Sequence, residues 1–86
     1  MEIENTNWWF CEHLSGCWQM CGIHDNEFQA KEQVFILCSN SRYTNAPASY
    51  RVWHNGRVIY SVSMVKGHIV QNQMDVLKLS WQKCGF

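Results

Sequence analysis

The sequence predicts an α+β fold, a small antiparallel β-meander of three to five strands with one short helix packed on its apolar face. Three observations lead to this prediction. Asn55-Gly56 lies between two stretches of alternating side chains, residues 25–33 combine a capping residue with helix formers, and the chain has 86 residues. A chain of this length forms a single small domain, residues 1–86, with one modest core.

Residues 5–24 are rich in Trp, Cys and His and fit two different structures. Five residues follow a helical spacing: Phe10, Leu14, Cys17, Trp18 and Cys21. The segment around Gly16 instead suggests a turn between two short strands, residues 8–13 and 17–23. Because glycine costs a helix about 1 kcal/mol relative to alanine, the two strands are favoured.

A helix is expected after this region. Asp25 is a good N-cap, and residues 26–33 are mostly helix formers. Phe28 and Phe35 are seven residues apart and would share one helical face. The apolar run at residues 34–39 is strand-sized, so we expect a buried strand there and a loop over residues 39–47.

The clearest signal is the hairpin at Asn55-Gly56. A two-residue type I′ turn needs positive φ at both positions, which Asn and Gly tolerate. This turn would pair His54 with Arg57, Trp53 with Val58, Val52 with Ile59 and Arg51 with Tyr60. Strict alternation then places one set in the core, Trp53, Val58, Tyr60, Val62 and Met64. It places another set in solvent, Tyr50, Val52, His54, Arg57, Ile59, Ser61 and Ser63. Residues 66–67 suggest a second turn, and residues 76–82 a further strand.

The charged residues are divided unevenly, although the formal net charge is zero. Residues 1–32 contain six of the seven acidic residues and one lysine, whereas residues 33–86 contain six of the seven basic residues and one aspartate. Such asymmetry favours a charged partner surface on one half of the chain. It also fits two halves that attract each other, within one fold or across a homodimer.

The first residues and the cysteines indicate a cytoplasmic protein. Residues 1–5 lack the basic and apolar regions of a signal peptide. The longest apolar run, residues 34–38, is far shorter than the roughly 20 residues of a membrane span. In the cytoplasm the five cysteines would stay reduced or bind metal. A secreted domain that carries an added methionine would overturn this expectation.

A cluster of cysteines and histidines is the candidate metal site. Zinc prefers four thiolate or imidazole ligands in a tetrahedral arrangement. Five such groups lie close together in the sequence: Cys11, His13, Cys17, Cys21 and His24. No C-x2-C pair is present, and free cysteines also pack as small apolar side chains. A structural zinc and packed thiols therefore remain alternatives, and no other cofactor is indicated.

No catalytic motif is present, and we expect a protein that is not an enzyme. The sequence contains no HExxH, no GxxxxGK[ST] and no GxGxxG motif. No glycine-rich oxyanion loop accompanies the Cys–His neighbours. A core of this size also leaves little room for the deep pockets of about 300 Å³ or more that small ligands use.

Protein binding is the function that the sequence favours. Neighbouring residues of a strand point to opposite sides, so Trp8 or Trp9 should be partly exposed. We expect two contact patches. The first would meet a basic surface and comprises Trp8, Trp9, Glu4 and Glu12, and the second comprises Tyr50, His54 and Arg57. The partner would be a larger protein or complex, and a small inhibitor or accessory protein of a virus or mobile element acts in this way.

Single-stranded nucleic acid is the second candidate ligand. The predicted solvent face of the meander combines aromatic and basic groups that could stack bases and neutralise phosphates. These residues are Tyr50, His54, Arg57, Ser61, Ser63, His68 and Lys78. Because the basic residues form no cluster, an ordinary solvated face explains the same pattern.

Overall fold

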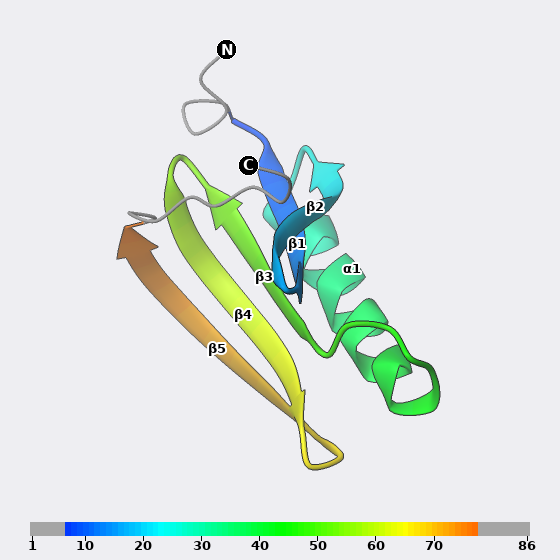
Figure 1. The fold of residues 1–86 in the computed structure, drawn as a ribbon. Helices are drawn as coiled ribbons and strands as arrows, with labels where there is room; N and C mark the ends of the chain where they lie inside the picture. Colours follow the sequence, from blue (N-terminus) through cyan, green and yellow to red (C-terminus); the bar gives the residue numbers. More distant parts are fainter. Residues whose placement is uncertain (1–6, 78–86) are drawn as a thin grey trace.

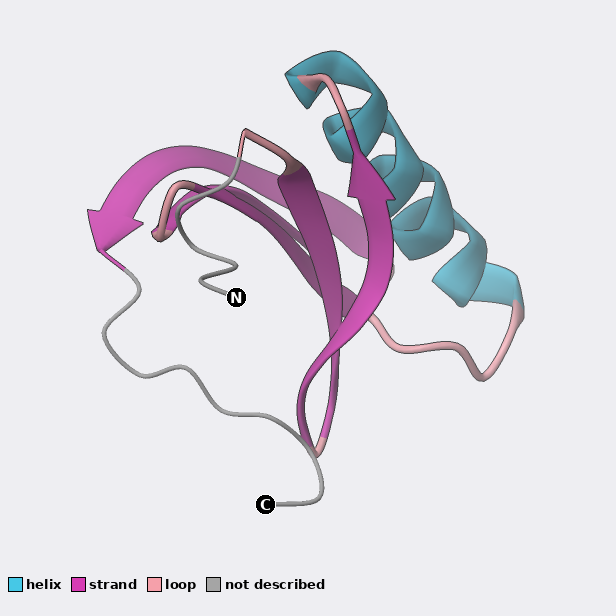
Figure 2. Cartoon of the chain, turned by 90° about the horizontal axis from the view of Figure 1, so that it is seen from above, coloured by secondary structure: helices cyan, strands magenta, loops and turns pink. Residues whose placement is uncertain are grey.

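The computed structural model describes residues 7–77, which form one antiparallel sheet with a helix against it (Figure 1). The elements follow in the order β1 (Trp9–Ser15), β2 (Cys17–His24), α1 (Glu27–Asn40), the 3₁₀ helix η2 (Ser41–Tyr43), β3 (Ser49–His54), β4 (Arg57–Val65) and β5 (His68–Leu77). The strand order is β2-β1-β3-β4-β5, so β2 and β5 are the edges. The predicted α+β class, with an antiparallel sheet and one helix, is confirmed. The helix lies on one side of a curved sheet (Figure 2).

Tight turns with left-handed residues connect the strand pairs. Gly16 has φ +78° between β1 and β2, which confirms the preference for two strands over a helix. Asn55 and Gly56 both have positive φ, as a type I′ turn requires. Lys66 and Gly67, in the turn between β4 and β5, also both have positive φ. The expected strand at residues 76–82 lies mostly outside the described residues.

The helix is longer than the sequence pattern predicts. Asn26, not Asp25, is the N-cap, and its side chain accepts a hydrogen bond from the backbone N–H of Gln29 at 2.8 Å. The predicted strand at residues 34–39 is wrong, because α1 continues through it. Ala30, Val34 and Cys38 are fully buried at a spacing of four residues, so one helical stripe faces the sheet.

A β-bulge in β4 changes the predicted pairing. His54 pairs with Arg57 and Trp53 with Val58 as expected, but Val52 pairs with Tyr60 because the register shifts there. The extra residue, Ile59, turns the rest of β4 over, since a one-residue slip exchanges the two faces of a strand. Tyr60 therefore shares the helix-covered core with Val52 rather than the opposite face with Trp53.

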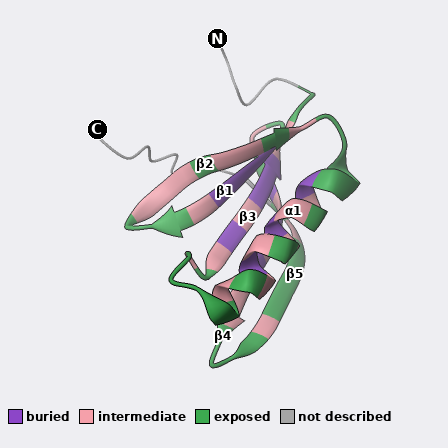
Figure 3. Cartoon of the chain, turned by 90° about the vertical axis from the view of Figure 1, so that its right-hand side faces the viewer, coloured by how far each residue is buried: buried purple, intermediate pink, exposed green. Residues whose placement is uncertain are grey.

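The sheet consequently has a buried apolar cluster on each face. The larger cluster lies under α1 and contains Cys11, Ala30, Val34, Cys38, Tyr50, Val52, Tyr60 and Val62. The smaller one contains Phe10, Trp53 and Val58, with Met74 packed against it. Phe10 and Trp53 are cross-strand partners with stacked rings 4.4 Å apart. Figure 3 shows the buried residues concentrated on the central strands and on the inner side of α1.

Glu12 and Arg51 form a buried ion pair between neighbouring strands. Glu12 is 1% exposed, and its Oε1 accepts a hydrogen bond from Arg51 Nε at 2.7 Å. The ring of Trp18 lies over the guanidinium group, 4.2 Å from its carbon. The pair lies on the sheet face opposite α1, because the neighbouring residues Cys11 and Val52 face the helix.

Candidate functional site: a groove between the helix and the edge strand

One helix cannot cover this sheet, and the uncovered part forms a groove. Five strands at a spacing of about 4.8 Å span about 19 Å, whereas a helix with its side chains is about 10–12 Å wide. Because α1 packs against β1, β2, β3 and β4 but hardly against β5, the sheet stays open along its β5 edge (Figure 1). An open groove of ≈310 Å³ lies there, which the sequence did not predict.

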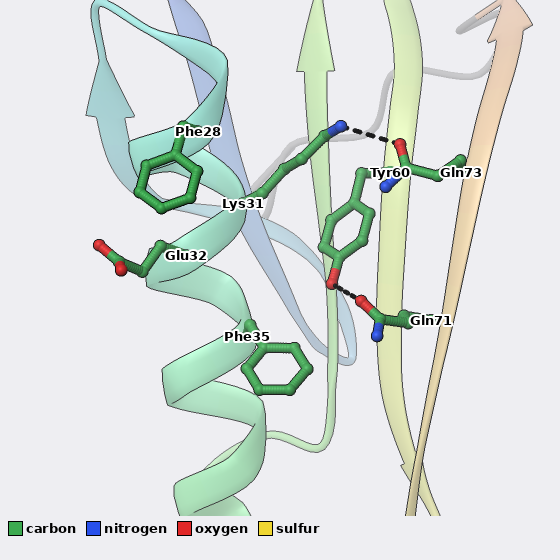
Figure 4. Close-up of a pocket in the computed structure, with 7 residues that line it drawn as sticks. All are labelled: Phe28, Lys31, Glu32, Phe35, Tyr60, Gln71 and Gln73. Atoms are coloured by element: carbon green, nitrogen blue, oxygen red, sulfur yellow. Dashed lines mark hydrogen bonds between the residues drawn. The ribbon is translucent and has the colours of Figure 1, made fainter.

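The wall of the groove comes from α1. Phe28, Lys31, Glu32 and Phe35 line it at the i, i+3, i+4 and i+7 positions that share one helical face. Phe28 is 72% exposed, which is unusual for a large apolar side chain, whereas Phe35 packs partly against the main core. The phenyl ring of Phe35 is directed toward the strands (Figure 4).

Polar side chains of β4 and β5 form the floor. The hydroxyl of Tyr60 donates a hydrogen bond to Gln71 Oε1 at 2.6 Å, and Lys31 Nζ donates one to Gln73 Oε1 at 2.8 Å (Figure 4). Burial raises the pKa of Tyr60, so its hydroxyl stays protonated and remains a donor. The ammonium group of Lys31 also lies 5.7 Å from the centre of the Tyr60 ring.

The charges at the wall leave one carboxylate available. Lys31 is engaged by Glu27 at 2.5 Å and by Gln73, so its charge is already compensated. Among residues 7–77, Glu32 makes no hydrogen bond or ion pair, and its side chain is exposed. The groove therefore offers an apolar surface beside a free negative charge.

The first predicted patch is only partly at the surface. Trp8 is 48% exposed, and Trp9 is half-buried with its ring stacked on His54 at 4.0 Å. Glu12 is buried in the ion pair with Arg51 and presents no surface charge. Glu4 lies outside the described residues.

The second predicted patch is also divided. Tyr50 is 2% exposed in the main core, so the prediction that it faces solvent is wrong. The pleat carries it to the side of the sheet that the helix covers. Arg57 is exposed and forms an ion pair with Asp75 on β5. The Trp9–His54 stack joins one member of each patch at one end of the sheet.

The residues of the proposed nucleic-acid surface do not share one face. Tyr50 lies under the helix, whereas Ser61 pairs with Arg51 and Ser63 with Ser49 on the opposite face. The bulge at Ile59 causes this division, because it exchanges the two faces of β4. Lys78 lies outside the described residues.

The candidate metal ligands lie in several environments. In the part of the chain that the structure describes, no three His, Cys, Asp or Glu side chains gather as a metal-binding group. Burial raises the pKa of the Cys11 thiol to about 12 and that of Cys21 to about 11, which favours the neutral form of each thiol. Cys17 is disulfide-bonded, whereas we expected a reduced thiol.

The two histidines of this set lie apart in the fold. His24 forms a hydrogen bond with Gln33 of α1 at 2.5 Å, while His13 meets Tyr50 edge to face. Gly22 allows this approach, because a Cβ there would lie 2.2 Å from Gln33 Oε1. The zinc site remains a prediction.

Comparisons with protein-family models, with curated proteins and with solved structures found no match for this chain. Within residues 7–77, no helix is both long and apolar enough to cross a membrane.

Proposed function

We propose that this protein is a non-catalytic protein-binding module that receives an apolar side chain of its partner in the groove between α1 and β5. The exposed Phe28 at the rim carries this proposal. Aromatic side chains at the centre of an interface contribute most of the binding energy in many complexes. An apolar side chain of the partner that packs between Phe28 and Phe35 would remove both rings from water.

The unpaired Glu32 supports a basic residue beside the apolar anchor of the partner. The helix wall belongs mostly to the acidic part of the chain, and Lys31 is compensated by its own neighbours. A lysine or arginine of the partner would gain a charge partner at the groove rim, which favours the correct register and faster association. A small domain that binds a segment of its partner in this way would block that segment, and so would act as an inhibitor or accessory protein.

A peptide library tests the proposal without knowledge of the natural partner. Random peptides displayed on phage are selected against the folded protein, and the affinity of the selected peptides is measured by fluorescence anisotropy. Loss of a central aromatic contact weakens binding about 30-fold or more, so we expect this effect for Phe28→Ala. Glu32→Lys should weaken the binding of peptides that contain a basic residue. Added salt should reduce the difference in affinity between this variant and the unmodified protein.

Ile36→Ala is the matched control. Ile36 is an apolar residue of the same helix, is 51% exposed and does not line the groove. Its replacement should leave the affinity unchanged. Selected peptides that bind Phe28→Ala and the unmodified protein equally would reject the groove as the binding site.

A further inference from the structure

We infer that the outer edge of β5 pairs in antiparallel fashion with β5 of a second copy of this chain. The two sheets would then form one continuous sheet across a twofold axis. This inference goes beyond the proposed function, because it uses the backbone of an edge strand rather than the side chains of the groove.

The edge of β5 has the properties of a pairing surface. The strand runs for 10 residues, and no other described strand lies on its outer side. Edge strands of monomeric proteins are usually protected by proline, charges or bulges. Residues 69–74 contain no proline and no charged residue. Their pairing with β4 is regular from His68 to Gln73, and the register shifts only between Gln73 and Val76, near the end of the strand.

The opposite edge is less suited to pairing. β2 has 8 residues, and a register shift between Met20 and Gly22 divides its pairing with β1 into two short stretches, whereas the pairing of β5 is regular from His68 to Gln73. A bulge twists a strand locally and interrupts a straight ladder of hydrogen bonds. We therefore assign the second copy to β5 rather than to β2.

The sequence of β5 is self-complementary in one antiparallel register. Residues directly opposite each other point to the same face, so the twofold axis passes midway between the two copies of one residue. With the two Asn72 residues opposite each other, Val70 lies opposite Met74 of the second copy, and Gln71 lies opposite Gln73 of the second copy. Val70 is 44% exposed in the single chain and would gain an apolar neighbour. Gln71 and Gln73 would form an amide pair, and no two like charges meet.

A twofold axis perpendicular to the sheet keeps both helices on the same side. The two α1–β5 grooves would then face each other across the joined β5 strands, each with its own Phe28 and Glu32. A single strand from an unrelated protein could also use this edge, but it would not share the self-complementary register around Asn72.

Charged substitutions at position 72 test the inference, because Asn72 is exposed in the single chain. The unmodified chain should elute with twice the 10.2 kDa chain mass in size-exclusion chromatography with light scattering at high protein concentration. Asn72→Lys places two like charges opposite each other and should give monomers. Asn72→Glu should do the same, and an equimolar mixture of the two variants should restore the dimer. Asn72→Ser is the neutral control and should remain dimeric.

Cysteine cross-linking tests the register. Asn72→Cys should form a covalent dimer under mild oxidation, because directly opposed Cα atoms lie about 4.5–5.5 Å apart, within disulfide range. Gln71→Cys should not cross-link with itself, since diagonal positions are about 7–8 Å apart, but it should cross-link with Gln73→Cys. The unmodified chain controls for its own thiols. A monomer at every concentration, or a dimer that Asn72→Lys leaves intact, would overturn the inference, and neither result bears on peptide binding in the groove.

Discussion

The buried ion pair of Glu12 and Arg51 gives the sharpest test of how this fold is stabilised. We consider three variants, namely Glu12→Leu, Arg51→Met and the double variant, all of which replace polar groups by apolar groups of similar volume. Each single variant leaves one charge buried without its partner, whereas the double variant removes both charges together. Phe10, Trp53 and Trp18 lie on the same face and offer apolar surroundings to the new side chains.

Removing one partner of a buried pair costs about 3–5 kcal/mol, whereas replacing both is often neutral or stabilising. The structure indicates which single change is worse. The Glu12 side chain is 1% exposed and that of Arg51 is 14% exposed, so an unpaired carboxylate reaches less water than an unpaired guanidinium group. We therefore expect about 4 kcal/mol for Arg51→Met and about 3 kcal/mol for Glu12→Leu. Small domains have a free energy of unfolding of about 5–15 kcal/mol, so either loss is readily measured.

Urea denaturation followed by tryptophan fluorescence measures these values. The free energy of unfolding comes from linear extrapolation, and equal m-values among the variants show that the comparison is valid. The double variant should be less destabilised than either single variant, which gives a favourable coupling energy. If the losses of the single variants simply add in the double variant, the two groups do not stabilise each other and the reasoning fails.

Three further predictions concern the thiols, a turn and the helix cap. Because unfolded thiols ionise near pH 9.0 while Cys11 and Cys21 have folded pKa values of about 12 and about 11, the free energy of unfolding should fall as pH rises above 9. The slope should be at most about 1.4 kcal/mol per pH unit for each thiol, and urea titrations from pH 8 to 10 should show a smaller slope for Cys11→Ala. Gly16→Ala should destabilise by about 1–2 kcal/mol, as thermal denaturation can measure; a Cβ there meets no atom within 4 Å, so Gly16→Asn, which tolerates positive φ better, should lose less. Asn26→Ala should cost about 1 kcal/mol and lower the midpoint of urea unfolding, whereas an unchanged midpoint would contradict its role as the N-cap.

The turns were predictable because their chemistry is local. Asn55-Gly56 and Gly16 require backbone conformations that few residues tolerate, and the structure has positive φ at each. The helix was harder to delimit, because a short apolar run fits a strand or a helix equally well. The signal that separates the two was the spacing of Ala30, Val34 and Cys38, which repeats every four residues.

The β-bulge at Ile59 could not be read from the sequence. Strict alternation assigned Tyr60 to the face of Trp53, and a single extra residue in β4 placed it under the helix instead. This bulge divided the proposed nucleic-acid face. Tyr50 is buried for a different reason, because it shares with Val52 the face of β3 that α1 covers.

The groove had a partial signal in the sequence. Phe28 and Phe35 are seven residues apart, which placed them on one helical face. What the sequence did not show is that this face extends beyond the core, because that depends on the number of strands beside the helix and on their order. Glu32 acquired its importance only when Lys31 was found to be engaged by Glu27 and Gln73.

The sheet is wider than its single helix, and this difference limits how substitutions can alter the exposed surface of the protein. Substitutions can make the uncovered strands more polar, but only a segment of chain outside residues 7–77 or another molecule can shield them from water. A second helix packed beside α1 would therefore complete the cover of this sheet. Among residues 7–77 no element covers this strip, which therefore stays open to any molecule that can fit beside the helix.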